Sequence, residues 1–387
     1  MKYDFDEIIV RKGTDCVKYD DLQGVFGRTD LLPMWVADMD FRTPKFVVDA
    51  IRQRLDHEVL GYTLPCESWY ENIIQWVGRR HNMQVKKEEI GFVPGIVRGI
   101  AFAVNCFTQP SDKVMVQTPV YHPFFLVTEH NHREVVYNSL EVHDGQVHIN
   151  FDSFEQKIQG CKLFILCNPH NPGGRVWTLE ELQRIAEICE RNGTKVISDE
   201  IHADLTLPGY EHHSYSTVSE AAREHSITFM APSKAFNMPG LSSSYSLIFN
   251  RDMREKFYAY MEASELSMGN MFAYLSCAAA YEHGEDWLKQ MLAYVQGNID
   301  YTEQYLQANI PSISMLKPPA SYLVFLDCRK LNLTQEKLVD LFVEKAHLAL
   351  NDGTMFGHEG KGFMRLNVGC PRSILHRALT LLAQAVG

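Results

Sequence analysis

The chain has 387 residues, of which 45% are hydrophobic and 22% charged, and its formal net charge is −11. This composition is ordinary for a soluble globular protein, and the length suits two domains or one large domain with an appendage. The acidic balance argues against a general nucleic-acid surface, although it leaves room for a small basic pocket. No apolar run approaches the length of a membrane span. From the charge balance we expect no nucleic-acid partner, and from the lack of such a run we expect no membrane partner.

The cysteines and the first residues favour a cytoplasmic protein. The nine cysteines are scattered through apolar segments without Cys-x-x-Cys pairs, which is typical of reduced core residues. The chain starts with acidic residues and lacks the apolar core of a signal peptide. The pairs His130/His132 and His212/His213 do not have convincing metal-binding spacing, so no metal site is expected.

In chain order, the first expected elements are a short apolar run at 31–41 and two helices. Thr43 and Pro44 suit the N-cap and the first residue of a helix. Its expected apolar stripe is Phe46, Val47, Ala50, Ile51 and Leu55. A break at Gly61-Tyr62-Thr63 precedes a second helix over 68–80, whose inward residues are predicted to be Trp69, Ile73, Trp76 and Val77.

The stretch from Ile90 to Ile100 predicts a strand, a turn and the start of a helix. The free N–H groups of such a helix start can hold a phosphate, and Gly95, Ile96 and Val97 would contribute mainly backbone contacts. Many α/β proteins have such a turn, so the signal is weak alone. The chain has no Gly-x-Gly-x-x-Gly fingerprint, which counts against a dinucleotide fold. A further strand starts at Lys113 and leads to an aromatic residue, Tyr121.

Three polar side chains follow buried strands that are predicted in succession. Asn171 comes after the apolar run 161–167, Asp199 ends the run from Thr194, and Lys234 follows the run that starts at Ile227. Two of them have an ordinary alternative: Asp199 could be a turn or N-cap carboxylate, and Lys234 could be a solvated loop lysine. In an open parallel sheet, ligands bind outside the carboxyl ends of the strands, so we expect the three side chains to face one crevice.

An amine, a buried acid and an amide together suit pyridoxal phosphate (PLP). The lysine amine can bond to the cofactor's aldehyde, the acid can keep the ring nitrogen protonated, and the amide can hydrogen-bond the ring oxygen. Near the C-terminus, Arg365 alternates with Met364 and Leu366 on an expected strand. A guanidinium grips a carboxylate through two parallel bonds, although a surface salt bridge is the alternative.

The motifs Asn-Pro-His-Asn-Pro-Gly-Gly, Asp-Glu-Ile-His and Ala-Pro-Ser-Lys-Ala-Phe-Asn resemble those of the fold-type I, aminotransferase-like PLP enzymes. Within this superfamily they are most similar to the cystathionine β-lyase-like C–S lyases. The resemblance covers nearly the whole chain. It implies an α/β fold with a three-layer α/β/α large domain, a mostly parallel sheet and a smaller α+β domain. We expect the large PLP-binding domain at 45–285 and the small domain at 1–44 and 286–387.

The resemblance also implies roles for individual residues. Tyr121 would stack on the pyridine ring, Arg365 would hold the substrate α-carboxylate, and the stretch around Ala37, with Asp38 and Met39, would lie near the substrate unless it is a simple linker. Tyr62 would reach across a homodimer interface to the partner's cofactor phosphate, with an exposed turn tyrosine as the alternative. The expected cofactor-binding set is Lys234, Asp199, Asn171, His202, Tyr121, Gly95, Ile96, Val97, Ser233 and Tyr62, and the substrate-binding set is Arg365, Ala37 and Asn171.

Two departures from the aminotransferase pattern bear on function. Ser242 stands near a position where many aminotransferases have an arginine for the phosphate, so Ser242, Ser233 and the backbone must do more unless Arg98 substitutes. His202 stands where classical aminotransferases place a tyrosine, which favours the C–S lyase branch. With this resemblance, the sequence predicts a cysteine-S-conjugate or cystathionine β-lyase that gives a thiol, pyruvate and ammonia, with Lys234, Asp199 and Tyr121 as catalytic residues. An aminotransferase is the alternative, and a non-catalytic regulator or a nicotinamide-dependent reductase fits less well.

Overall fold

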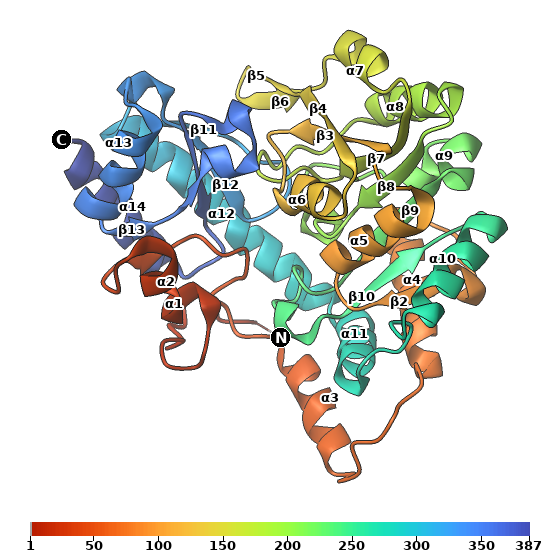
Figure 1. The fold of residues 1–387 in the computed structure, drawn as a ribbon. Helices are drawn as coiled ribbons and strands as arrows, with labels where there is room; N and C mark the ends of the chain where they lie inside the picture. Colours follow the sequence, from red (N-terminus) through yellow and green to blue (C-terminus); the bar gives the residue numbers. More distant parts are fainter. Residues whose placement is uncertain (1) are drawn as a thin grey trace.

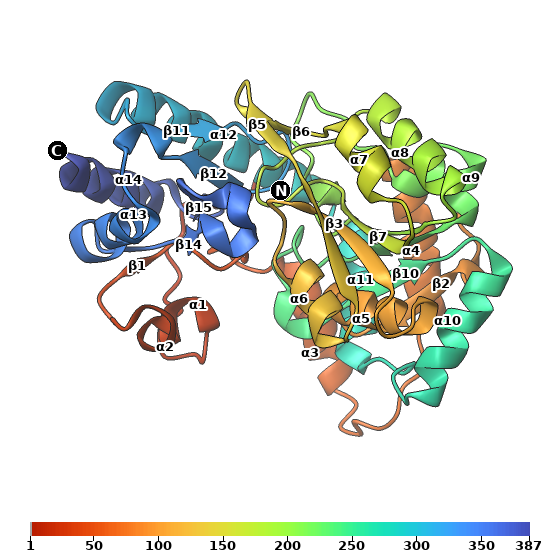
Figure 2. The same cartoon turned by 45° about the horizontal axis from the view of Figure 1, so that its top comes forward.

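The computed structural model describes residues 2–387 (Figures 1 and 2). Its largest sheet has seven strands in the order β2-β10-β9-β8-β7-β3-β4. The strand β10 is antiparallel to both of its neighbours, whereas the pairs from β9 to β4 are parallel. The bounds are β2 Ile90–Val93, β3 Lys113–Thr118, β4 Glu134–Ser139, β7 Cys161–Cys167, β8 Lys195–Asp199, β9 Ser226–Met230 and β10 Ser244–Leu247.

Helices cover both faces of this sheet, because its central strands are apolar on both sides. In β7, Leu163 and Ile165 belong to one core cluster, whereas Phe164 and Leu166 belong to another, as the two-residue period of a strand requires. The helices around the sheet are α3 Lys45–Leu55, α4 Glu67–His81, α5 Ile96–Phe107, α6 Pro123–His130, α7 Phe151–Lys157, α8 Leu179–Arg191, α9 Glu220–Glu224, α10 Arg251–Ala263 and α11 Met271–His283. A small hairpin of β5 Glu141–His143 and β6 Gln146–His148 lies beside them.

A second, smaller unit combines the N-terminal and C-terminal parts of the chain, which lie side by side in both views (Figures 1 and 2). Its four-stranded sheet has the order β11-β12-β15-β14, and a separate parallel pair joins β1 to β13. The strands are β1 Leu32–Pro33, β11 Ser314–Leu316, β12 Leu323–Asp327, β13 Leu348–Ala349, β14 Asn351–Asp352 and β15 Phe363–Asn367. The helices are α1 Val17–Asp20, α2 Leu22–Phe26, α12 Glu285–Asn309, α13 Gln335–Asp340 and α14 Arg372–Val386.

The start of α3 differs from the sequence prediction. The N-cap residue is Pro44, and no side chain caps the helix. The hydroxyl of Thr43, expected to cap it, instead donates to the carbonyl oxygen of Asn237 at 2.8 Å. Of the predicted apolar stripe only Val47 is buried, and Leu55 is 46% exposed. The hydroxyl thus stabilises a long-range contact rather than the helix.

Backbone contacts attach the loop before β12 to the segments that follow β7 and β8 of the large sheet. The N–H of Leu207 donates to the carbonyl of Pro319 at 2.9 Å, and the N–H of Ala320 donates to the carbonyl of Gly174 at 3.1 Å. Gly174 has φ +68°, and a Cβ there would lie 2.2 Å from the Cβ of Pro318. A side chain at position 174 would therefore push the loop away. The division into two domains at residues 45 and 285 remains a prediction.

Candidate active site

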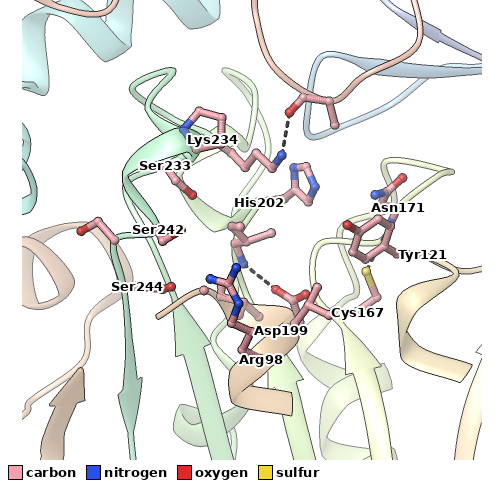
Figure 3. Close-up of a pocket in the computed structure, with 17 residues that line it drawn as sticks. Arg98, Tyr121, Cys167, Asn171, Asp199, His202, Ser233, Lys234, Ser242 and Ser244 are labelled. Carbon is pink, nitrogen blue, oxygen red and sulfur yellow. Dashed lines mark hydrogen bonds between the residues drawn. The ribbon is translucent and has the colours of Figure 1, made fainter. Parts of the chain in front are cut away.

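A cavity of about 400 Å³ lies at the carboxyl ends of the central parallel strands (Figure 3). Cys167 and Asp199 face each other in the register of β7 and β8, and Asp199 faces Phe229 of β9. The volume is in the range of small-ligand sites, roughly 300–1,000 Å³. The predicted residues that line it are Ala37, Gly95, Ile96, Val97, Tyr121, Asn171, Asp199, His202, Ser233 and Lys234.

Lys234 lies in the turns that follow β9, and its side chain is half-buried. Its Nζ donates to the carbonyl oxygen of Ala37 at 2.6 Å. Burial lowers the pKa of Lys234 to about 8; the carboxylates of Asp38 and Asp199 oppose this shift, and Arg365 adds to it. A lysine with a lowered pKa is neutral in a larger fraction near neutral pH, which suits a nucleophile and a general base.

Asp199 is the last residue of β8, and it is buried. Burial raises the pKa of Asp199 to about 7, while the N–H of Ile201, which donates to its Oδ1 at 3.0 Å, acts in the opposite direction. A buried carboxylate with this pKa is costly to ionise unless a cation pairs with it. It is therefore suited to face a protonated ring nitrogen.

The cavity is also lined by donors for an anion. The helix α5 begins after Gly95, which has φ +113°, and no side chain caps it. The first amides of a helix have no partner within the helix, so those after Gly95 are available to a ligand. The hydroxyls of Ser233 and Ser242 line the same cavity and have no hydrogen-bond partner within residues 2–387. Arg98 also lines it, with its Nη1 donating to the carbonyl of Pro94.

Asn171 and Tyr121 lie on the β7 side of the cavity (Figure 3). The N–H of Tyr121 donates to the carbonyl of Asn171 at 3.0 Å, so the two residues are held together by the backbone. Burial raises the pKa of Tyr121, so its phenol is neutral at physiological pH. Both predicted positions therefore belong to one wall of the cavity.

Arg365 lies on β15 beside this wall, and only 5% of it is exposed. Its Nη1 donates to Oδ1 of Asn171 at 3.2 Å, and its Nη2 donates to Oδ1 of Asn351 at 2.6 Å and to the carbonyl of Trp35 at 3.0 Å. Burial lowers the pKa of Arg365 to about 10, so the group stays cationic at neutral pH. No carboxylate of residues 2–387 pairs with it, and its Nε is buried without a partner. A buried guanidinium in this state suits an anionic ligand.

His202 lines the cavity as a neutral group. Burial lowers its pKa to about 3, and the positive charges of Lys234 and Arg365 add to that shift. Its Nδ1 is buried and unpartnered within the described part of the chain. A neutral imidazole can offer one donor and one acceptor to a bound ring.

Two predicted site residues, Arg365 and Tyr62, do not line this cavity. Arg365 lies beside the wall that Asn171 forms. Tyr62 is fully exposed in the segment between α3 and α4 and does not line the cavity. Its proposed action on a partner's cofactor involves a second chain, so the prediction stays open. The sequence reasoning did not single out Cys167, Ile201, Ser243 and Ser244 as lining residues. The run of serines at 242–244, just after the lysine motif, was a signal from which the last two could have been predicted.

The residues present fit pyridoxal phosphate. Uncapped amides and free hydroxyls suit its phosphate, the buried carboxyl of Asp199 suits its pyridinium nitrogen, and the amine of Lys234 suits its aldehyde. Among residues 2–387, no group of three or more His, Cys, Asp or Glu side chains could hold a metal ion. No helix in the same range is long and apolar enough to cross a bilayer.

A doubly covered, mostly parallel sheet with a lysine, an acid and an amide at its carboxyl edge defines the class as an aminotransferase-like PLP fold. Residues 29–382 match the family model described as aminotransferase class I and II, and the chain belongs to that family. The predicted superfamily and fold class are thereby confirmed.

Three known proteins are similar over nearly the whole chain. Cystathionine beta-lyase PatB of Bacillus subtilis (strain 168) is 41% identical over 384 residues, which cover 99% of each chain. Cystalysin of Treponema denticola, whose crystal structure contains a pyridoxal 5'-phosphate cofactor, is 33% identical with a TM-score of 0.96, covering 100% of this chain and 99% of the other. The PLP-bound C–S lyase of Staphylococcus hominis is 33% identical with a TM-score of 0.93, covering 100% and 98%.

Proposed function

We propose that this protein is a PLP-dependent carbon–sulfur β-lyase that, with water, converts S-substituted L-cysteines, L-cystathionine among them, to a thiol, pyruvate and ammonia. The observation that carries the proposal is the convergence of Lys234, Asp199 and Asn171 on one cavity beside a buried, carboxylate-free Arg365. PatB, cystalysin and the Staphylococcus hominis enzyme support the carbon–sulfur lyase reading through their likeness over the full chain.

Each residue has a distinct task in this reaction. Pyridoxal phosphate, when bound, supplies an electron sink for the charge that develops at the substrate Cα. Arg365 binds the α-carboxylate and, with Asn171, fixes the orientation of the Cα–H bond. The amine of Lys234 removes the Cα proton as a general base, for which a pKa of about 8 is well placed. Asp199 stabilises the protonated ring nitrogen from its buried position.

The test is an incubation of the purified protein with L-cystathionine and pyridoxal phosphate, but without a keto acid. We expect pyruvate and free thiol to form in equal amounts. Because the same side chains can support transamination, the family description makes an aminotransferase the second candidate. Turnover that depends on an added keto acid, with no thiol released, would favour that candidate and refute the lyase.

We further propose that the protein acts as a homodimer in which Tyr62 reaches the partner's cofactor phosphate. The segment between α3 and α4 carries apolar side chains that are largely exposed, with Val59 at 65%, Leu60 at 58% and Leu64 at 81%. Exposed apolar residues gathered on one segment are typical of an interface. The variant Tyr62→Phe should bind pyridoxal phosphate more weakly while remaining dimeric by light scattering. Unchanged cofactor affinity, or a monomeric wild type, would contradict the proposal.

A further inference from the structure

The carbonyl oxygen of Ala37 accepts hydrogen bonds from two side chains that are far apart in the sequence. Lys234 Nζ donates to it at 2.6 Å, and the hydroxyl of Tyr322 donates to it at 3.0 Å. In Figure 3 a dashed line marks the hydrogen bond from the amine of Lys234 to this oxygen, and both residues line the cavity. Tyr322 is 1% exposed, and its hydroxyl has no other partner among residues 2–387.

Ala37 lies in a segment that we call the active-site strap, residues 34–41, and side chains hold this strap on both sides of Ala37. Asn367 donates from Nδ2 to the carbonyls of Val36 at 2.6 Å and Asp38 at 2.7 Å. Asn237 donates to the carbonyl of Met39 at 2.9 Å. These bonds hold the backbone on both sides of the Ala37 carbonyl.

We propose that Tyr322 is a positioning residue of the reaction, because its hydroxyl shares the Ala37 oxygen with the amine of Lys234. The amine of the freed lysine then has a hydrogen-bond acceptor in a defined position that binds it only weakly. The inference rests on the proposed function, in which the amine of Lys234 is released from the cofactor, stays beside the substrate and removes the Cα proton. Tyr322 acts only through the Ala37 oxygen and does not line the cavity.

The carbonyl oxygen of Ala37 accepts from two donors at once, and each donor weakens the hydrogen bond of the other. A carbonyl oxygen has two lone pairs, and the ammonium form of lysine gains more from such an acceptor than the neutral amine does. When Tyr322 occupies one lone pair, the oxygen holds the ammonium less strongly, and the neutral amine that can act as base is favoured. The carboxyl groups of Asp38 and Asp199 also face the lysine and raise its pKa, whereas Arg365 lowers it and His202 is neutral there.

The variant Tyr322→Phe removes the hydroxyl and keeps the ring. We measure how fast cofactor-free protein takes up pyridoxal phosphate across a pH series, from the change in visible absorbance, since only the neutral amine reacts with the aldehyde. The pH of half-maximal uptake should rise by about half a unit to one unit, the effect of one net hydrogen bond on an ionisation. The acidic limb of kcat for the lyase reaction should move in the same direction.

The matched control is Tyr305→Phe, in which the hydroxyl lost donates to Thr380 Oγ1 at 3.3 Å in a part-buried contact between α12 and α14. It should leave both profiles unchanged. An uptake profile for Tyr322→Phe that keeps the wild-type midpoint, or that falls equally at every pH, would overturn the inference even if the thermal midpoint drops. A wild type that takes up no pyridoxal phosphate would refute the proposed function and this inference with it.

Discussion

The substitution Arg365→Lys tests how the substrate carboxylate is held. Lysine keeps the positive charge but loses the planar fork that can bind both carboxylate oxygens, so one charge-assisted hydrogen bond is lost. Such a bond contributes about 1.5–3 kcal/mol of interaction free energy. Each ~1.4 kcal/mol of free energy changes a binding constant by a factor of ten. We therefore expect kcat/KM for S-substituted cysteines to fall about ten- to a hundredfold, mainly through KM, because the contact is present both before and during the reaction.

The assay compares an S-substituted L-cysteine with the corresponding amide, which lacks the α-carboxylate. Wild type should prefer the acid strongly, and Arg365→Lys should lose most of that preference while it takes up pyridoxal phosphate normally. The control is Arg329→Lys, since Arg329 is half exposed and pairs with Asp327 at 2.7 Å on the surface of the smaller unit. An unchanged preference for the acid, or loss of cofactor uptake in Arg365→Lys, would refute the role assigned to this guanidinium.

Two further predictions concern stability. In cofactor-free protein, burial raises the pKa of Asp199 from 3.8 to about 7. The contribution of Asp199 to folding stability is therefore fully present below its unfolded-state pKa, and it is lost as the pH rises toward its folded-state pKa. Thermal melts should show wild type losing stability relative to Asp199→Asn across that interval, and a constant difference would contradict this. Gly174→Ala should lower the free energy of unfolding by more than the ~1–2 kcal/mol of left-handed backbone strain, because the new Cβ meets Pro318. Gly193 has φ +64° and open space around it, so Gly193→Ala should show the backbone strain alone. Equal losses in urea unfolding would refute the close-approach argument.

Local patterns allowed much of the fold to be predicted. Thr178 and Glu181 have the spacing of a capping box, and they form that box at the start of α8. Trp69 and Trp76 are buried on α4, as their spacing predicts. The cavity follows from the same logic, because adjacent parallel strands end at one edge and place Asn171, Asp199 and Lys234 along it.

The rest depends on contacts between residues that are far apart in the chain. Nothing in the surroundings of Tyr322 in the sequence indicates that its hydroxyl reaches the Ala37 oxygen, 285 positions away. The same holds for Asn351, whose amide oxygen holds Arg365 from the neighbouring strand β14. Thr43 is the opposite case: the sequence predicts that its side chain caps a helix, but its hydroxyl donates to the carbonyl oxygen of Asn237 instead. Local propensity is overridden wherever a stronger tertiary partner lies within reach.

The most direct test of the account is to find the lysine that carries the cofactor. Holoenzyme is reduced with borohydride to make the bond to pyridoxal phosphate permanent, digested, and its peptides are analysed by mass spectrometry. We expect the added mass on the peptide that contains Lys234, and its complete absence in Lys234→Ala. A label on another lysine, or an unlabelled protein, would contradict the assignment of the site.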